Sequence, residues 1–185
     1  MPKIVDHDAY RRELLEGGFA LFARLGFASV TMRRLARELG VSTGTLYHYF
    51  ETKDDFFEQM VRQVAGRSVV EAISAVPQSS RIEERLDALL AFLEAGESDL
   101  RQFIAIILEY RRHSQSEQAD KVIEEALHGY RQALREQLEL GDARRADGVL
   151  SVVIGLLTHR TLRGATDGLR EDAASLRRLV LTEAE

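Results

Sequence analysis

Cysteine is absent from the 185-residue sequence, and proline occurs only at positions 2 and 77. Without cysteine, the chain can form no disulfide, no thiolate metal site and no thiol redox sensor. The two prolines interrupt no periodic apolar segment, and no strand-like alternation of apolar and polar residues is present. Because the sequence also lacks an apolar run of about 20 residues and a signal-peptide core, we expect a cytoplasmic, all-α protein that does not enter a membrane.

Signatures of enzymes and metalloproteins are missing as well. There is no glycine-rich phosphate loop and no nucleophile elbow. The five histidines show no metal-ligand spacing; they are His7, His48, His113, His128 and His159. We therefore expect no enzymatic activity, no metal and no other cofactor.

The charge balance excludes a polybasic nucleic-acid binder but leaves room for a local basic surface. The formal net charge of the chain is −5 at pH 7. Between residues 31 and 53, however, there are four basic residues and only two acidic ones. Such a segment would bind DNA with few phosphate-neutralising cations, so we expect the affinity to depend only modestly on salt concentration.

The most informative segment, residues 31–50, has the pattern of two short helices joined by a tight turn. Thr31 and Ser42 are candidate N-caps, because a hydroxyl there accepts a hydrogen bond from a free backbone N–H. Gly40 tolerates the left-handed backbone that a sharp turn requires. The apolar positions expected to be buried are Met32, Leu35, Ala36, Leu39, Leu46 and Phe50. This pattern predicts a helix-turn-helix, which places its second helix in the major groove of DNA.

The remaining residues of the second helix suit a contact with DNA. Thr43 and Thr45 offer hydroxyl and methyl groups to bases, and Gly44 lets the backbone approach them. Lys53 at the start of the next helix can hold a phosphate, and Arg33 is placed nearest a guanine. The full expected DNA-binding set is Thr31, Arg33, Ser42, Thr43, Gly44, Thr45, Tyr47, His48, Tyr49 and Lys53.

The segment from residue 14 to about residue 57 resembles the N-terminal domain of the tetracycline-repressor (TetR) family of bacterial transcription regulators. The matching positions are Ala20, Leu21, Phe22, Gly26, Phe27, Thr31, Leu35, Ala36, Leu39, Gly40, Val41, Ser42, residues 44–50, Lys53 and Asp54. The resemblance implies a dimer that binds a palindromic double-stranded DNA operator, usually as a repressor, and is released by a small-molecule effector. Many family members carry lysine or arginine where this chain has Thr43, so the base preference of a relative cannot be transferred.

Beyond this segment, the periodicity predicts only helices, about nine in the whole chain. Outside the two short motif helices, we expect them at residues 8–25, 53–75, 81–95, 99–113, 117–140, 143–162 and around residues 176–181. The predicted fold class is all-α, and the resemblance implies a three-helix helix-turn-helix DNA-binding domain at residues 1–52, followed by a helical effector-binding and dimerisation domain at residues 53–185. The helix at 53–75 would bridge the two.

The helix expected at 143–162 is apolar around its whole girth and so needs partners on more than one side. In the resembled family, the last two helices of each subunit form a four-helix dimer interface. We expect the homodimer interface to contain Val149, Val152, Val153, Leu156, Leu176, Leu179 and Val180. The alternative is that this helix forms the core of the C-terminal domain.

The resemblance also implies an effector pocket in the C-terminal domain. The candidate lining residues are Phe92, Phe103, Ile107, Tyr110, His113 and Tyr130. Because pockets are mostly apolar with few orienting polar groups, we expect an apolar or aromatic ligand of modest size. The alternative for each of these residues is an ordinary place in the core or at its rim.

Two other functions remain open from the sequence alone. The chain could be a small helical enzyme or ligand carrier whose N-terminal helices are structural, or a protein-interaction adaptor that does not touch DNA. The first predicts titratable groups converging in the C-terminal core, where only scattered candidates occur. Binding to DNA would exclude both.

Overall fold

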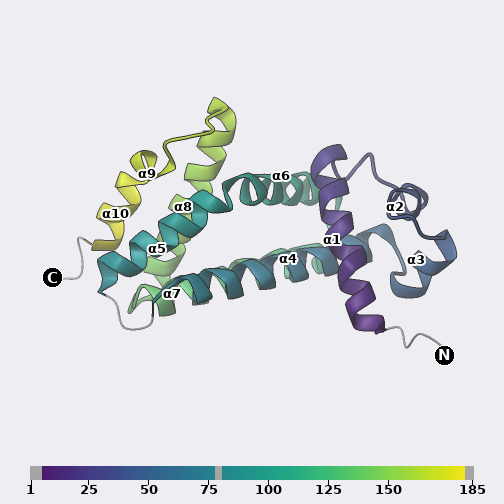
Figure 1. Cartoon of the computed structure of the whole chain (residues 1–185), viewed down its shortest axis with the longest axis horizontal. Helices are drawn as coiled ribbons and strands as arrows, with labels where there is room; N and C mark the ends of the chain where they lie inside the picture. The colour runs from purple at the N-terminus through teal and green to yellow at the C-terminus, as the bar shows by residue number, and fades with distance from the viewer. Residues whose placement is uncertain (1–5, 78–80, 182–185) are drawn as a thin grey trace. The chain divides into compact units, whose positions relative to one another are not determined.

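The computed structural model describes residues 6–77 and 81–181. For Ser175 and Leu179, within the second range, it describes only the backbone. Regular secondary structure in these ranges is helical throughout (Figure 1), which confirms the expected all-α class. Every helix in them is too short or too polar to span a lipid bilayer. The helices are α1 (His7–Leu25), α2 (Met32–Glu38), α3 (Thr43–Tyr49), α4 (Lys53–Ala75), α5 (Ile82–Ala95), α6 (Glu97–His113), α7 (Glu117–Gln137), α8 (Ala143–Arg163), α9 (Leu169–Asp172) and α10 (Ala174–Leu181).

The helices pack into two compact units. The first unit contains Met1–Ala65 and Ala105–Ala126, and the second contains Gly66–Ile104 and Leu127–Glu185. Helices α4, α6 and α7 therefore each begin in one unit and end in the other. Packing assigns the first half of α4 to the same unit as α2 and α3, whereas the functional boundary between residues 52 and 53 remains a prediction.

Hydroxyl caps begin α2 and α3, as the sequence predicts. Thr31 Oγ1 accepts a hydrogen bond of 3.2 Å from the Arg34 N–H, and Ser42 Oγ accepts one of 2.9 Å from the Thr45 N–H. Between the helices, Gly40 has a φ of 71°, which a residue with a Cβ rarely adopts. The caps and the glycine together define the turn that sets α3 beside α2 (Figure 1).

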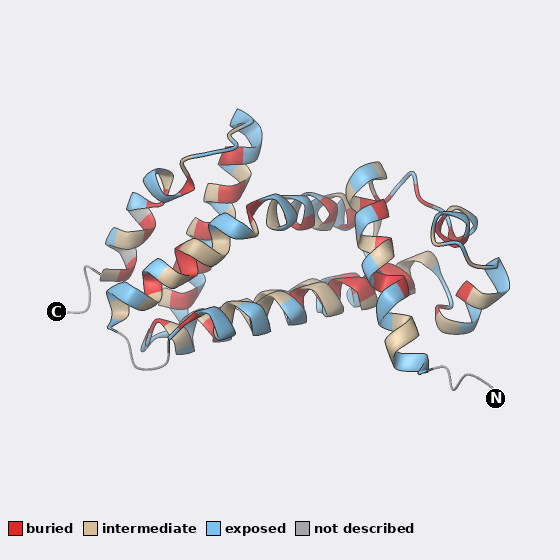
Figure 2. Ribbon diagram, in the orientation of Figure 1, coloured by how far each residue is buried: buried red, intermediate tan, exposed pale blue. Residues whose placement is uncertain are grey.

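Phenylalanine rings form the core of the first unit. The rings of Phe22 and Phe57 meet edge to face with centroids 5.1 Å apart, and both side chains are fully buried. Buried residues, red in Figure 2, occur on both α1 and α4. Phe56 lies so close to α1 that a Cβ on Gly18 would stand 2.3 Å from its Cε1. The glycine in the middle of α1 is thus explained by the close packing of α4 against it.

The second unit is built around α5, α8 and α10, and its core contains several residues of the expected dimer interface. Because α10 packs against both α8 and α5, apolar residues on all three helices face one another within one chain. Four of the expected interface residues are no more than 8% exposed in this core: Val149, Val153, Leu176 and Val180. Val152 and Leu156 are partly buried against the same core, and the side chain of Leu179 lies outside the described part of the structure.

Candidate nucleic-acid interface

Helix α3 has one buried side and one open side. Leu46 and the following Phe50 are completely buried and attach the helix to the first unit. On the open side, Tyr47 is 54% exposed, and Thr43 and Gly44 are also exposed. The open side therefore combines a hydroxyl, bare backbone and a phenol, which are groups that can meet base edges and phosphates.

The two hydroxyl groups at the start of α3 bond to each other. Ser42 Oγ and Thr45 Oγ1 are 2.8 Å apart, and Ser42 also caps the helix. Thr45 is partly buried, whereas Thr43 is exposed. Of the two threonines, Thr43 is thus the freer to contact a base, and Thr45 contributes to the helix start as well.

Tyr49 at the end of α3 is held by residues from the start of α1. Its hydroxyl lies 2.7 Å from His7 Nδ1, and its carbonyl accepts a hydrogen bond of 3.0 Å from Arg11 Nη2. The ring of Tyr10 meets it edge to face, with centroids 5.7 Å apart. Sequence reasoning did not connect α1 to this surface, because the contacts join residues about forty positions apart.

Lys53 is placed differently from the other residues of the expected set. Its Nζ donates a hydrogen bond of 3.1 Å to the Phe27 carbonyl and lies 3.9 Å from the centroid of the Phe27 ring. This partial burial lowers the pKa of the lysine from its usual value. The ammonium group thus stabilises the α1–α2 connection and would have to leave Phe27 to reach a phosphate.

Arginines on α2 supply the remaining charge near α3. Arg33 is exposed, as expected for a residue that contacts DNA. The side chain of Arg34, in contrast, turns back to donate to the Ser29 carbonyl at 3.4 Å. Glu38 neutralises Arg37 and also accepts a hydrogen bond of 2.9 Å from a residue of α1, Arg24. The cation on α2 that remains available for a partner is therefore Arg33.

Three of the six expected pocket residues belong to the first unit and have other roles. Tyr110 is fully buried, donates a hydrogen bond to Glu58 and meets the Phe27 ring edge to face at 4.8 Å. His113 is exposed, with its Nδ1 2.8 Å from the carbonyl of Glu109. The third, Ile107, is partly buried. Tyr110 therefore packs under the α1–α2 connection of its own unit, and its place in an effector pocket stays a prediction.

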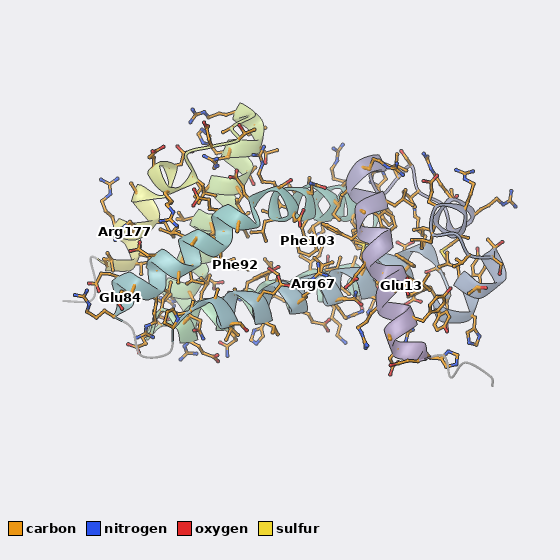
Figure 3. The ribbon with its side chains drawn as sticks, in the orientation of Figure 1. Glu13, Arg67, Glu84, Phe92, Phe103 and Arg177 are labelled. Atoms are coloured by element: carbon orange, nitrogen blue, oxygen red, sulfur yellow. The ribbon has the colours of Figure 1, made fainter. Side chains whose placement is uncertain are left out.

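The other three pocket candidates belong to the second unit. Figure 3 labels two of them, Phe103 on α6 and Phe92 on α5. Phe103 is 7% exposed, and Phe92 is partly buried. Burial raises the pKa of the Tyr130 phenol on α7. These three residues remain the candidates for an effector site.

A buried ion-pair network in the second unit had no counterpart in the sequence analysis. Arg160 is completely buried and donates to Glu97 Oε1 at 2.8 Å and to Glu97 Oε2 at 3.1 Å. It also donates to Asp172 and to the carbonyl of Asp167. The hydrogen bonds from Arg160 are the main reason that the pKa of Glu97 is lowered. The network joins the start of α6 to the end of α8 and to α9.

Comparison with known proteins points to one family. The sequence profile described as bacterial regulatory proteins, tetR family, matches residues 14–60. The HTH-type transcriptional regulator BetI of Rhizobium meliloti is 25% identical over 183 residues, which cover 94% of this chain and 89% of that protein. A BetI regulator of Escherichia coli is 32% identical over 93 residues, 49% of this chain and 47% of that protein, so this second match spans about half of the relative.

Solved structures show the same fold. A TetR transcription regulator from Haloarcula marismortui superposes with a TM-score of 0.76 at 19% identity, covering 94% of this chain and 97% of that one. The transcriptional regulator FadR of Bacillus subtilis, solved in complex with stearoyl-CoA, gives a TM-score of 0.73 at 19% identity, covering 91% and 97%. At these identities, the likeness establishes the fold alone.

Proposed function

Because this chain belongs to the tetR family of bacterial regulatory proteins and is a DNA-binding transcriptional regulator, we propose that it acts as a homodimeric repressor. In this proposal, the dimer binds a palindromic operator, and a small-molecule effector releases it. The DNA-binding part of the proposal rests on one observation, which is that α3 has one buried side and one exposed side. Leu46 is fully buried while Tyr47, its neighbour, is 54% exposed.

The residues on the open side of α3 and on α2 would make two kinds of contact, one with bases and one with phosphates. Thr43 and Gly44, at the helix start, would contact bases, since the first residues of a recognition helix enter the major groove most deeply. Tyr47 and His48 would bind phosphates and fix the register of the helix. Arg33 on α2 would add the guanidinium contact to a guanine.

Dimerisation is supported by the outer face of α8. A Cβ added to Gly148 or Gly155 would meet nothing within 4 Å, and Leu162, seven residues further on, is 82% exposed. A spacing of seven residues keeps these positions on nearly the same side of a helix. This open stripe, together with the partly buried Val152 and Leu156, would pack against the same helix of a second copy. The three valines and one leucine that lie in the core of the single chain, Val149, Val153, Val180 and Leu176, would support this stripe from within.

Effector binding is proposed for the second unit. Phe92, Phe103 and Tyr130 would line the site, and their apolar rings favour an apolar or aromatic ligand. The structural relative FadR, which was solved with stearoyl-CoA, has a ligand of partly apolar character. The helices α4 and α6 run from this unit into the first one, so they would transmit the effect. A hundredfold change in DNA affinity requires only about 2.7 kcal/mol of coupling.

Selection of bound duplexes from a random pool tests the proposal. We expect enrichment of an inverted repeat whose half-sites lie about one helical turn apart, bound by a species of twice the chain mass. The enriched duplex would then be used in a gel shift, with mixed-sequence DNA as the control. Failure to enrich any duplex would contradict the proposal and would favour an adaptor or a ligand carrier.

A further inference from the structure

The start of α1 adds an imidazole to the end of α3. His7 Nδ1 is 2.7 Å from the Tyr49 hydroxyl, and the ring centroids of His7 and His48 are 6.3 Å apart. Tyr49 also meets the His48 ring edge to face, with centroids 5.1 Å apart. Both histidines are exposed, and Tyr49 is partly exposed. Two exposed imidazoles and a phenol thus form a cluster beside the proposed groove face.

We propose that the pair His7 and His48 binds the DNA backbone in its protonated form, so that the affinity for duplex DNA rises as the pH falls from 8 to 6. The inference rests on the proposed function and adds a residue of α1 to its DNA contacts. Histidine is the side chain that gains a charge in this pH range, and a nearby phosphate favours the charged form.

Protonation of His7 would also change its hydrogen bond with Tyr49. A neutral His7 can accept the Tyr49 hydroxyl proton at Nδ1, which leaves the phenol without a free donor. A protonated His7 carries a hydrogen on both ring nitrogens, so Nδ1 must donate to the Tyr49 oxygen. The hydroxyl proton of Tyr49 is then free to donate to a phosphate oxygen. One proton taken up by His7 therefore adds a charge and releases a second donor.

The charged groups that the structure places beside the cluster come from the start of α1. Asp6 accepts hydrogen bonds from the Ala9 and Asp8 N–H groups, and the first of these is the main reason that its pKa is lowered. The charges of Arg12 and His7 lower the pKa of Asp6 further, and Arg11 donates to the Tyr49 carbonyl. Protonation of the two histidines therefore adds positive charge to a surface that already carries charges of both signs.

The test measures the affinity for duplex DNA against salt concentration at pH 6 and at pH 8. The probes are the duplex enriched by the selection above and a mixed-sequence duplex of equal length. For the wild type, we expect about tenfold tighter binding at pH 6 than at pH 8, a difference of about 1.4 kcal/mol. The slope of log affinity against log salt should steepen by about 0.9 for each added phosphate contact.

Glutamine variants identify the groups responsible. Glutamine can still bond to Tyr49 but cannot be charged, so His7→Gln and His48→Gln should each reduce the difference between the two salt slopes. The double variant should abolish it. His128→Gln is the matched control, because His128 is an exposed histidine on α7 in the other unit, and it should keep the wild-type difference.

Three results would overturn the inference. The first is equal salt slopes at both pH values in the wild type, and the second is a pH dependence that survives in the double variant. The third is a complete loss of the pH dependence in His48→Gln alone, which would show that His7 contributes nothing. Failure of the wild type to bind either duplex at any pH is a different outcome. It would contradict the proposed function itself and the inference with it.

Discussion

Tyr110 Oη on α6 donates a hydrogen bond of 2.9 Å to Glu58 Oε1 on α4. Both side chains are buried, and the same tyrosine ring lies against Phe27 and Phe57. The preceding residue, Glu109, accepts a hydrogen bond of 3.0 Å at its Oε1 from the Ala28 N–H. The end of α6 thus holds both α4 and the α1–α2 connection, so α6 would offer the proposed effector signal a route in addition to α4.

Tyr110→Phe should destabilise the first unit. The variant keeps the packing of the ring but leaves the buried carboxylate of Glu58 without its donor. An unsatisfied buried acceptor costs about 1–3 kcal/mol, so the urea midpoint should fall accordingly with little change in the m-value. The control is the double variant Tyr110→Phe/Glu58→Met, which removes both polar partners and should regain most of the loss. A single variant as stable as the wild type would show that the hydrogen bond contributes nothing.

Alkaline pH should weaken the fold through the same tyrosine. Burial, reinforced by the hydrogen bond to Glu58, raises the pKa of Tyr110 well above the ordinary value of 10.0. Above that value, the unfolded chain loses the phenol proton while the folded chain keeps it, so folding stability falls with rising pH. The limiting slope is about 1.4 kcal/mol per pH unit. Urea unfolding between pH 9 and pH 11 should show a steeper loss for the wild type than for Tyr110→Phe, and parallel curves would contradict this.

Arg160→Met should be far more damaging than Arg163→Met on the same helix. Arg160 is completely buried, and its loss would leave the carboxylates of Glu97 and Asp172 without their main partner. Breaking a buried pair costs about 3–5 kcal/mol. Arg163 approaches the same Asp172 at 4.0 Å, but its side chain is 59% exposed, and an exposed pair contributes about 1 kcal/mol or less. The midpoints of thermal unfolding of the two variants should therefore differ by many degrees. Similar decreases in the two midpoints would contradict a stabilising role of the buried network.

The stabilising effect of the Arg160 pair should depend on pH. The hydrogen bonds from Arg160 lower the pKa of Glu97, so the unfolded chain takes up its proton first as the solution is acidified. The contribution is then present above the ordinary glutamate pKa of 4.5 and is lost as the pH falls through the lower folded value. Acid unfolding of the wild type should show this loss, whereas Arg160→Met should keep only the smaller part that Arg101 contributes through its own hydrogen bond to Glu97.

Gly18→Ala should destabilise the protein, and Gly66→Ala should stabilise it. An alanine Cβ at position 18 would stand 2.3 Å and 2.4 Å from two ring carbons of the buried Phe56, which overpacks the α1–α4 contact. Overpacking typically costs about 1–3 kcal/mol. At Gly66, in the middle of α4, a Cβ would meet nothing within 4 Å, so alanine should gain about 0.5–1 kcal/mol. Chemical denaturation of both variants checks the signs, and equal effects would contradict the packing.

Local features of the fold were predictable from the sequence. The hydroxyls of Thr31 and Ser42 mark the starts of α2 and α3 because caps are made by residues next to the helix, and the expected bounds of α4 agree with the observed ones. The end of α7 was misplaced by three residues, at 140 instead of 137. Glu139 there takes a left-handed φ of 50°, a conformation that its residue type does not signal.

Contacts between distant residues were not predictable. Tyr110 was expected in an effector pocket, because an aromatic residue on an apolar helix fits a pocket as well as a core, and its contact with Phe27 could not be foreseen. For the same reason, α8 was recognised as apolar on all sides, but the pattern could not tell which side meets α10. The contact of His7 with Tyr49 spans 42 positions and leaves no periodic trace in the sequence.

The measurement that most directly tests the account is the affinity of two α3 variants for the selected duplex and for point-substituted duplexes. Tyr47→Ala should weaken binding to all of them about tenfold or more, since a hydrogen bond to a charged group contributes about 1.5–3 kcal/mol. Thr43→Ala should instead alter the base preference at one position in each half-site. The control is Val70→Ala, which truncates an exposed side chain on α4 and should bind all the duplexes as the wild type does. If both α3 variants kept wild-type affinity and preference, the open side of α3 would not be the surface that reads DNA.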